Sequence, residues 1–239
     1  MSDWTSPKFD RSIGLKKRIL IAAVVVILMT FAAYAALFVA PTESKMGTIQ
    51  RIFYLHAPSG MVALLSFFVC FVGNLAYVFT RKPKWDWLGV SAAEVGMAFC
   101  TVLIITGPIW AHPVWGIWWT WDARLTLTFV LWLLYTSYLL LRTLVEDPDR
   151  RALISAIYGI FAFLDVPLVY GSIRWWRTQH PQPVIMGGAG SGLEPTMRKV
   201  FWFWFLNLVI LMIFLIRERY ALEAMRGEVQ SIEREAEAT

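Results

Sequence analysis

The sequence is poor in charged residues. Only 16% of its 239 residues are Asp, Glu, Lys or Arg, and 58% are hydrophobic. A soluble globular domain carries about 25% charged residues. The low charge therefore excludes an ordinary soluble domain and favours a protein whose surface faces lipid. Internal repeats are also absent, and nothing in the pattern suggests a second domain.

Cysteine is scarce as well. Cys70 and Cys100 are the only two, and both lie inside apolar runs with no C-x-x-C spacing. Buried cysteines of this kind behave as small apolar residues, which argues against thiol redox chemistry. The net charge of +5 comes from Lys and Arg in the loops, where they orient a membrane protein. Membrane lipid is thus an expected partner, and nucleic acid is not.

Six apolar runs have the length of membrane-spanning helices, about twenty residues each. They predict an all-α polytopic membrane protein that forms one membrane domain over 1–239. The first run follows Lys16, Lys17 and Arg18 and resembles a signal peptide, but it is longer than a signal core, which favours an uncleaved first span. The predicted spans are 19–40, 59–80, 87–108, 125–144, 152–170 and 200–216.

The distribution of Lys and Arg predicts the orientation. Of the 22 Lys and Arg residues, fifteen fall on the side that holds both termini, and seven fall on the other side. Positive loops stay in the cytoplasm. Both termini are therefore expected in the cytoplasm, with the loops 41–58, 109–124 and 171–199 outside.

The outer loop 109–124 is rich in tryptophan. If Pro113 opens a short helix there, Trp115, Trp118, Trp119 and Asp122 share one face, and Trp121 borders it. Such a face is a wide indole platform with a carboxylate at its edge. It suits a flat, largely apolar ligand, because indoles supply a large rigid contact area.

The alternative is a tryptophan belt that only anchors the protein at the membrane interface. A belt populates both interfaces. Here nine of the thirteen tryptophans fall on the predicted outer side, which favours a binding surface. The nine are Trp110, Trp115, Trp118, Trp119, Trp121, Trp175, Trp176, Trp202 and Trp204.

All three histidines, His56, His112 and His180, fall on the same outer side. A macrocycle with an iron centre fits this pattern, because imidazole is the usual axial ligand of haem iron. His56 and His180 flank the tryptophan loop, whereas His112 is either a third ligand in another state or a polar residue beside Pro113.

Haem propionates require cations, and the candidates differ in strength. Arg174, Arg177 and Arg51 are the stronger ones. Arg124 is weaker, because on the helical interpretation of the loop it points away from the tryptophan face. Two carboxylates, Glu94 and Asp165, lie at membrane depth. Each is either a protonated packing contact or functional, Asp165 as a cavity residue near a kink at Pro167 and Glu94 as a partner contact.

Three motifs resemble the haem exporter protein C (CcmC) family, the tryptophan-rich "WWD" membrane proteins of bacterial cytochrome c maturation. Length, six spans and motif order match over nearly the whole chain. Two departures are His112, where another polar residue is expected, and Asp165, where an amide is expected. The motifs are Phe53-Tyr54-x-His56-x-Pro58, Trp115-Gly-x-Trp118-Trp119-x-Trp121-Asp122-Ala-Arg-Leu-Thr126 and Trp175-Trp176-x-Thr178-x-His180.

The resemblance implies a haem-delivery protein rather than an enzyme, located in the bacterial inner membrane. It implies that haem b is held at the periplasmic face on the WWD loop, with His56 and His180 as the iron ligands. The implied partners are a periplasmic CcmE-like haem chaperone, CcmA- and CcmB-like ABC transporter subunits, and a small CcmD-like single-span subunit. The expected binding residues are His56, His180, Trp115, Trp118, Trp119, Trp121, Asp122, Arg174 and Arg177.

Two other classes of protein stay open. One is a cytochrome c synthetase-type haem ligase, whose tryptophan motif is similar, although those proteins are larger. The other is a permease for an aromatic or sugar substrate, although six spans without inverted repeats make it less favoured. A haem absorption band would separate the permease from the other two.

Overall fold

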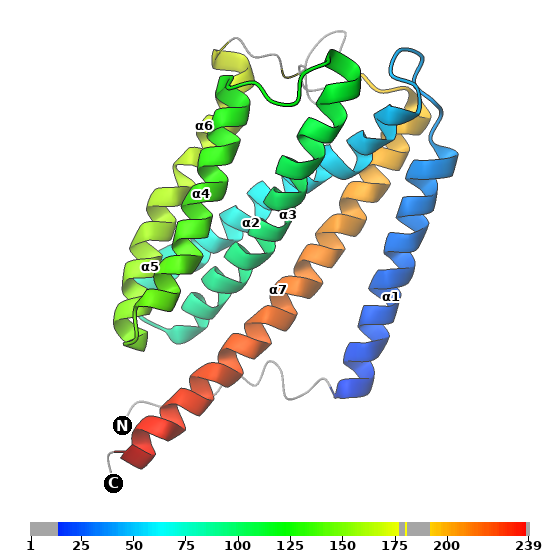
Figure 1. Ribbon diagram of the computed structural model, residues 1–239. Helices are drawn as coiled ribbons and strands as arrows, with labels where there is room; N and C mark the ends of the chain where they lie inside the picture. The colour runs from blue at the N-terminus through cyan, green and yellow to red at the C-terminus, as the bar shows by residue number, and fades with distance from the viewer. Residues whose placement is uncertain (1–13, 177–179, 181–191, 238–239) are drawn as a thin grey trace.

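The computed structural model describes residues 14–176, 180 and 192–237, and these residues contain helices but no β-strand. Figure 1 shows the helices running roughly lengthwise through one bundle. In chain order the elements are α1 (Leu15–Tyr34), the π turn η1 (Ala35–Val39), the 3₁₀ turn η2 (Thr48–Arg51), α2 (Ile52–Thr80), α3 (Pro83–Trp115), α4 (Ala123–Leu144), α5 (Pro148–Phe163), α6 (Asp165–Trp175) and α7 (Pro195–Glu237).

Six helical segments are long and apolar enough to cross a membrane, which confirms the predicted fold class. In Figure 1, α1 begins and α7 ends at the bottom of the molecule, while the loops 40–47 and 116–122 lie at the top. We call the top the tryptophan end and the bottom the opposite end. The six segments are Leu15–Val39, Thr48–Thr80, Pro83–Trp115, Ala123–Leu144, Pro148–Trp175 and Pro195–Glu237.

The antiparallel pair α2 and α3 forms the centre of the bundle. A Cβ atom on Gly73 of α2 would lie 2.9 Å from the backbone nitrogen of Gly89 on α3. Only glycine permits so close an approach of two helix backbones. The helices α4, α5 and α6 lie on one side of this pair in Figure 1, and α7 and α1 lie on the other.

The helices extend beyond the apolar runs that predict them. α2 already begins at Ile52, so His56 and Pro58 lie inside a helix rather than before one, and α3 continues through Pro108 to Trp115. α7 also continues as one helix from the sixth span to Glu237. An apolar run marks the part of a helix that faces hydrocarbon, whereas backbone hydrogen bonding continues past it.

The fifth span is interrupted at Leu164, three residues before Pro167, and Leu164 itself keeps helical backbone angles. α5 ends at Phe163, Leu164 forms the turn, and α6 begins at Asp165. Pro167 then lies in the first turn of α6, where a missing backbone N–H removes no helical hydrogen bond. The Asp165 side chain is buried, and its Oδ2 atom has no hydrogen-bond partner among the described residues.

Candidate functional site

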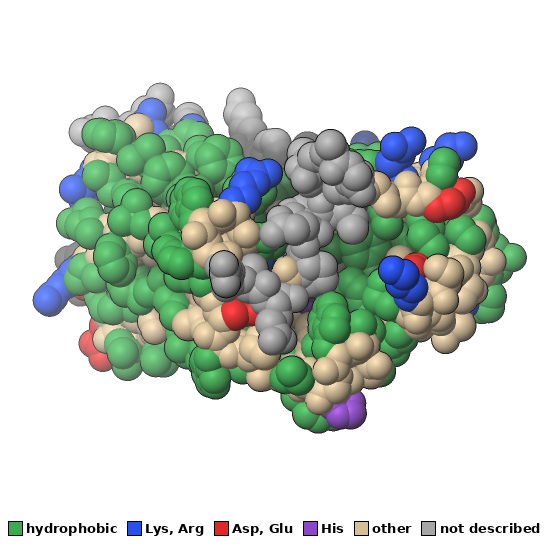
Figure 2. Space-filling model, turned by 90° about the horizontal axis from the view of Figure 1, so that it is seen from above, with side chains coloured by type: hydrophobic (Ala, Val, Ile, Leu, Met, Phe, Trp, Pro, Cys, Tyr) green, Lys and Arg blue, Asp and Glu red, His purple; other side chains and the backbone are tan. Residues whose placement is uncertain are grey.

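A cavity of about 1230 Å³ opens at the tryptophan end. Ligand pockets usually measure roughly 300–1,000 Å³, so this one has room for a large cargo. Figure 2 looks onto this end and shows hydrophobic side chains over much of the face, with scattered Lys and Arg. The predicted binding residues that line the cavity are His56, His180, Trp115, Trp118, Trp119, Asp122 and Arg174.

His56 reaches the cavity from α2 and is held against α3. The residue is 9% exposed, and Nδ1 lies 3.0 Å from Oγ1 of Thr106. Trp110 meets the ring edge-on, with the two centroids 5.7 Å apart. A Cβ atom on Gly107 would lie 3.3 Å from the ring, so His56 sits directly on the α3 backbone. The imidazole is therefore fixed by packing and by one hydrogen bond.

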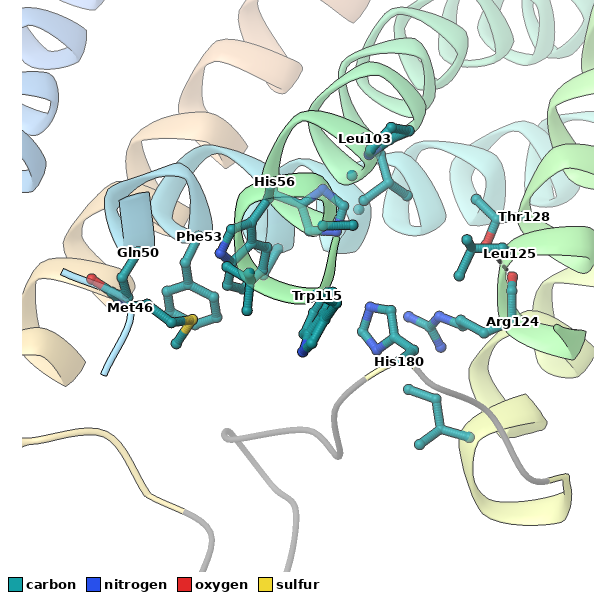
Figure 3. A pocket seen from close by; sticks show the side chains of 18 of the residues that line it. Met46, Gln50, Phe53, His56, Leu103, Trp115, Arg124, Leu125, Thr128 and His180 are labelled. Carbon is teal, nitrogen blue, oxygen red and sulfur yellow. Dashed lines mark hydrogen bonds between the residues drawn. The ribbon is translucent and has the colours of Figure 1, made fainter. Parts of the chain in front are cut away.

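His180 enters the same cavity from the segment after α6. Figure 3 shows its ring between Trp115 and Arg124. Both His180 and Arg124 are near enough to His56 to interact with it electrostatically. Two imidazoles that lie far apart in the sequence thus face one space.

His112 is at the same end but outside the cavity lining. It is exposed and stacks on Trp118, with ring centroids 4.1 Å apart and an angle of 18° between the planes. Of the two interpretations of this residue, the structure favours the polar residue that packs beside the tryptophan loop.

The prediction of a helix over the tryptophan loop is wrong. α3 ends at Trp115, because Gly116 adopts φ 72° and donates its N–H to the carbonyl of His112 at 2.8 Å. This left-handed glycine terminates the helix. Pro113 lies in the last turn of α3 instead of opening a new helix, and the chain from 117 to 122 is not helical.

Although the loop is not helical, three of the predicted tryptophans line the same cavity. Trp115 at the end of α3 and Trp118 and Trp119 in the loop all line the cavity, so a helix end and a loop form the platform. Trp121 is 72% exposed, packs on Trp119 and Phe129, and is not part of the lining. Trp110, which the sequence argument did not select, lines the cavity beside His56.

Asp122 holds the far end of the loop. It is the N-cap of α4: its Oδ1 accepts the Leu125 N–H at 3.0 Å, and its Oδ2 accepts the Thr120 hydroxyl at 3.1 Å. An N-cap carboxylate satisfies a backbone donor at the helix start and favours the helix dipole. Asp122 thus fixes the loop between two helices while it lines the cavity.

The prediction that Arg124 points away from the tryptophan face is wrong. The side chain lines the cavity and donates to the carbonyl of Val169 on α6 at 2.7 Å. The argument failed because the loop is not helical. Arg174 lies at the cavity edge over the Tyr170 ring, 5.4 Å from its centroid. Arg51 is not part of the lining, and Arg177 lies outside the described residues.

Two carboxylates at the cavity rim bind their own backbone. Glu194 accepts the Thr196 and Met197 N–H groups at 2.8 and 2.9 Å, and these bonds lower its pKa. Glu43 in the loop 40–47 accepts backbone N–H groups in the same way, which also lowers its pKa. Both stay ionised at neutral pH, and the bonds to local amides account for their positions.

Glu94 is paired with a residue of this chain. It forms an ion pair with Arg219 of α7, whose Nη2 lies 2.7 Å from Glu94 Oε1. The contact joins α3 to α7 within this chain. Of the two interpretations of Glu94, this geometry supports a packing contact within the chain, and contact with a partner protein stays a prediction.

The fold is that of a polytopic membrane protein with a large aromatic cavity at one end. Two histidines and two arginines line this cavity, and together these features define the class of protein. The sequence model described as heme exporter protein C matches residues 1–238. The chain therefore belongs to the heme exporter protein C (CcmC) family.

Individual relatives support the assignment. The heme exporter protein C of Bradyrhizobium diazoefficiens is 29% identical over 225 residues, which cover 93% of this chain and 85% of that protein. The heme exporter protein C of Haemophilus influenzae is 25% identical over 227 residues, which cover 95% of this chain and 92% of that protein. A Marchantia polymorpha protein, named as a candidate ccmC-like mitochondrial protein of cytochrome c biosynthesis, is 28% identical over 170 residues, covering 71% and 72%.

Proposed function

We propose that this protein binds haem b in the cavity at the tryptophan end and delivers it for cytochrome c maturation. The single observation that carries the proposal is the pair His56 and His180, which enter one aromatic cavity from different elements. Two imidazoles are enough for an iron that already has four ligands from a macrocycle. The described residues contain no group of three or more His, Cys, Asp or Glu that could hold a bare metal ion.

In this proposal His56 and His180 would hold the haem iron, and the tryptophans would pack on the porphyrin. Trp115, Trp118 and Trp119 make the main contacts, and Trp121 supports Trp119 from outside. Propionates would meet Arg174 and Arg124, which line the cavity, together with Arg177. Asp122 keeps the loop in place as the α4 cap.

We also propose that the tryptophan end faces the periplasm and that both termini are cytoplasmic, in a bacterial inner membrane. The support is the excess of Lys and Arg on the side of the termini. Haem bound there would lie on the side where a periplasmic chaperone could receive it.

The proposed role is binding and delivery rather than catalysis. The receiver would be a CcmE-like chaperone, and the complex would include CcmA- and CcmB-like transporter subunits and a CcmD-like single-span subunit. Membership of the heme exporter protein C family supports these partners.

The test is the visible spectrum of the purified full-length protein, in which a Soret band is expected. His56→Ala and His180→Ala should each lose haem or change its spin state. His112→Ala is the matched control, because His112 lies at the same end and touches Trp118 but not the cavity. It should retain the parental six-coordinate spectrum.

Other outcomes assign another function. Unchanged spectra in both His56→Ala and His180→Ala would remove the two-histidine site. A protein that never takes up haem but binds an aromatic or sugar compound would favour the permease. Formation of a covalent thioether between haem and an apocytochrome by the protein alone would favour the ligase.

A further inference from the structure

The hydrogen bond between His56 and Thr106 decides which ring nitrogen is available to a ligand. Nδ1 faces α3 and lies 3.0 Å from Thr106 Oγ1. The ring is held there by Gly107 below it and by Trp110 at its edge. Since Nδ1 is turned to α3, Nε2 is the nitrogen left for the cavity that His56 lines.

The hydroxyl hydrogen of Thr106 already takes part in another hydrogen bond. The hydroxyl donates to the carbonyl of Val102, one turn earlier in α3, at 2.7 Å. A hydroxyl has one hydrogen, and a carbonyl can only accept. If the hydroxyl keeps its bond to Val102, Thr106 Oγ1 accepts from His56, and the donor is Nδ1–H of a neutral imidazole.

This arrangement has a consequence for metal binding. A neutral imidazole with its proton on Nδ1 carries a free lone pair on Nε2, which is the form that ligates a metal. In the other tautomer Nε2–H could not ligate. Hydrogen bonding of the remote nitrogen also fixes the ring orientation and raises ligand basicity.

We propose that Thr106 is a positioning residue that holds His56 in the Nδ1–H tautomer and aims Nε2 at the haem iron. The proposal rests on the proposed haem site. Thr106 itself does not line the cavity and acts only through His56.

The first experiment examines the tautomer without haem. The full-length protein carries three histidines, so ¹⁵N-histidine labelling in lipid nanodiscs gives few signals, and His56→Ala assigns those of His56. At a pH well above the ordinary histidine pKa, the parent and Thr106→Ser should show protonated Nδ1 and unprotonated Nε2. Thr106→Val should reduce that preference. A parental spectrum with the proton on Nε2 overturns the proposal.

The second experiment measures haem. Loss of a remote hydrogen-bond partner of a ligating histidine typically costs about 10–100-fold in affinity. Thr106→Val should show a loss of this size and a higher haem midpoint potential, whereas Thr106→Ser should stay close to the parent. Parental affinity and potential in Thr106→Val overturn the proposal.

Thr101→Val is the matched control. Thr101 lies on the same helix, donates to Met97 at 2.8 Å and accepts the Trp132 N–H at 3.0 Å, but it is not part of the cavity lining. Equal losses in Thr101→Val and Thr106→Val would mean a general effect on α3 and overturn the proposal.

The outcomes also separate this inference from the proposed function. If His56→Ala and His180→Ala both bind haem like the parent, the haem site itself is wrong. If His56→Ala loses haem while Thr106→Val does not, only the role of Thr106 fails.

Discussion

The two ends of the bundle use polar residues in opposite ways. At the opposite end, polar groups are paired inside the chain: Arg142 binds both carboxylate oxygens of Asp86 at 2.6 and 2.9 Å, and Tyr138 donates to Asn74 at 3.4 Å. At the tryptophan end, His56, His180 and Arg124 project into a large cavity.

The comparison teaches how to separate structural from functional polar residues in a membrane protein. Buried charges cost free energy unless they are paired. The ion pair Asp86–Arg142 meets that condition through its own geometry and needs no ligand. The imidazoles at the tryptophan end line a cavity of about 1230 Å³, where a ligand could reach them.

The largest effect is expected from breaking the pairing at the opposite end. Arg142→Met leaves the Asp86 carboxylate buried without its partner, and removal of one member of a buried pair costs about 3–5 kcal/mol. Denaturant unfolding in detergent micelles measures this loss. Arg226→Ala, which breaks an exposed pair with Glu223, should cost less than about 1 kcal/mol.

A double variant tests whether the loss of stability comes from the unpaired charge and whether it leaves the haem site intact. Asp86→Leu with Arg142→Leu removes both charges and should recover most of the stability, because no unpaired charge remains. Haem uptake by the folded fraction should stay parental in both variants. A double variant as unstable as Arg142→Met would show that the pair itself is not the cause.

The next prediction compares a glycine-to-alanine substitution at the two ends of the bundle. A Cβ atom on Gly159 would lie 2.1 Å from Nδ2 of the buried Asn74, so Gly159→Ala should cost about 1–3 kcal/mol through overpacking. At Gly60 in the cavity wall, the nearest atom would be the flexible end of Leu103 at 3.1 Å. Gly60→Ala should therefore be close to neutral in the same unfolding experiment. Equal costs at both positions would contradict the contrast between a packed end and a hollow one.

A smaller effect is expected from the aromatic wall. Aromatic contacts contribute about 0.5–1.5 kcal/mol each beyond area burial, so Trp118→Ala with Trp119→Ala should weaken haem retention about tenfold or more. Membrane insertion and the number of spans should not change. Trp121→Ala, at a residue outside the lining, should have a smaller effect. If the double variant retains haem as the parent does, the tryptophans serve only as an interfacial belt.

The smallest effect is expected at Asp122, where the tryptophan loop meets α4. Asp122→Ala removes the α4 cap and the contact with Thr120, and loss of an N-cap costs about 1 kcal/mol. Asp122→Asn keeps an acceptor and should retain most of the stability. Thermal unfolding of the two variants gives the difference. A larger haem defect than stability defect in Asp122→Asn would point to a direct role of the carboxylate charge.

The fold could be predicted from sequence because the bilayer imposes it. Six runs of about twenty apolar residues give six helical spans, since only a helix satisfies its own backbone in lipid. The helix ends could not be predicted, because α2 and α3 continue beyond the apolar runs, where composition no longer marks the helix.

The candidate site could be predicted in part. Alternating spans place His56 and His180 at one end, and the structure brings both to one cavity. The shape of the tryptophan loop was missed because a single backbone angle at Gly116 ends α3, and the orientation of Arg124 depends on that loop. Trp110 and Thr106 had one usable signal: with Leu103 and Gly107 they follow i, i+3, i+4, i+7 spacing on one helical face.

The non-helical segment between Gly116 and Asp122 also determines how deep the molecule sits. Its backbone amides lack the repeating helical bonds, so this stretch belongs at headgroup level, where water reaches it. α4 begins right after it, and its 22 residues rise about 33 Å, close to the hydrocarbon thickness of about 30 Å. The 33 residues of α3 rise about 50 Å, so α3 must tilt or protrude.

The lower part of the cavity, at Leu131 on α4, therefore lies below the level of the headgroups, whereas the mouth at Asp122 lies among them. A flat cargo with an apolar ring and acidic side groups would divide between these two levels. Its ring would rest at acyl-chain depth, and its carboxylates would remain in the hydrated layer, as in an amphiphile at a membrane surface.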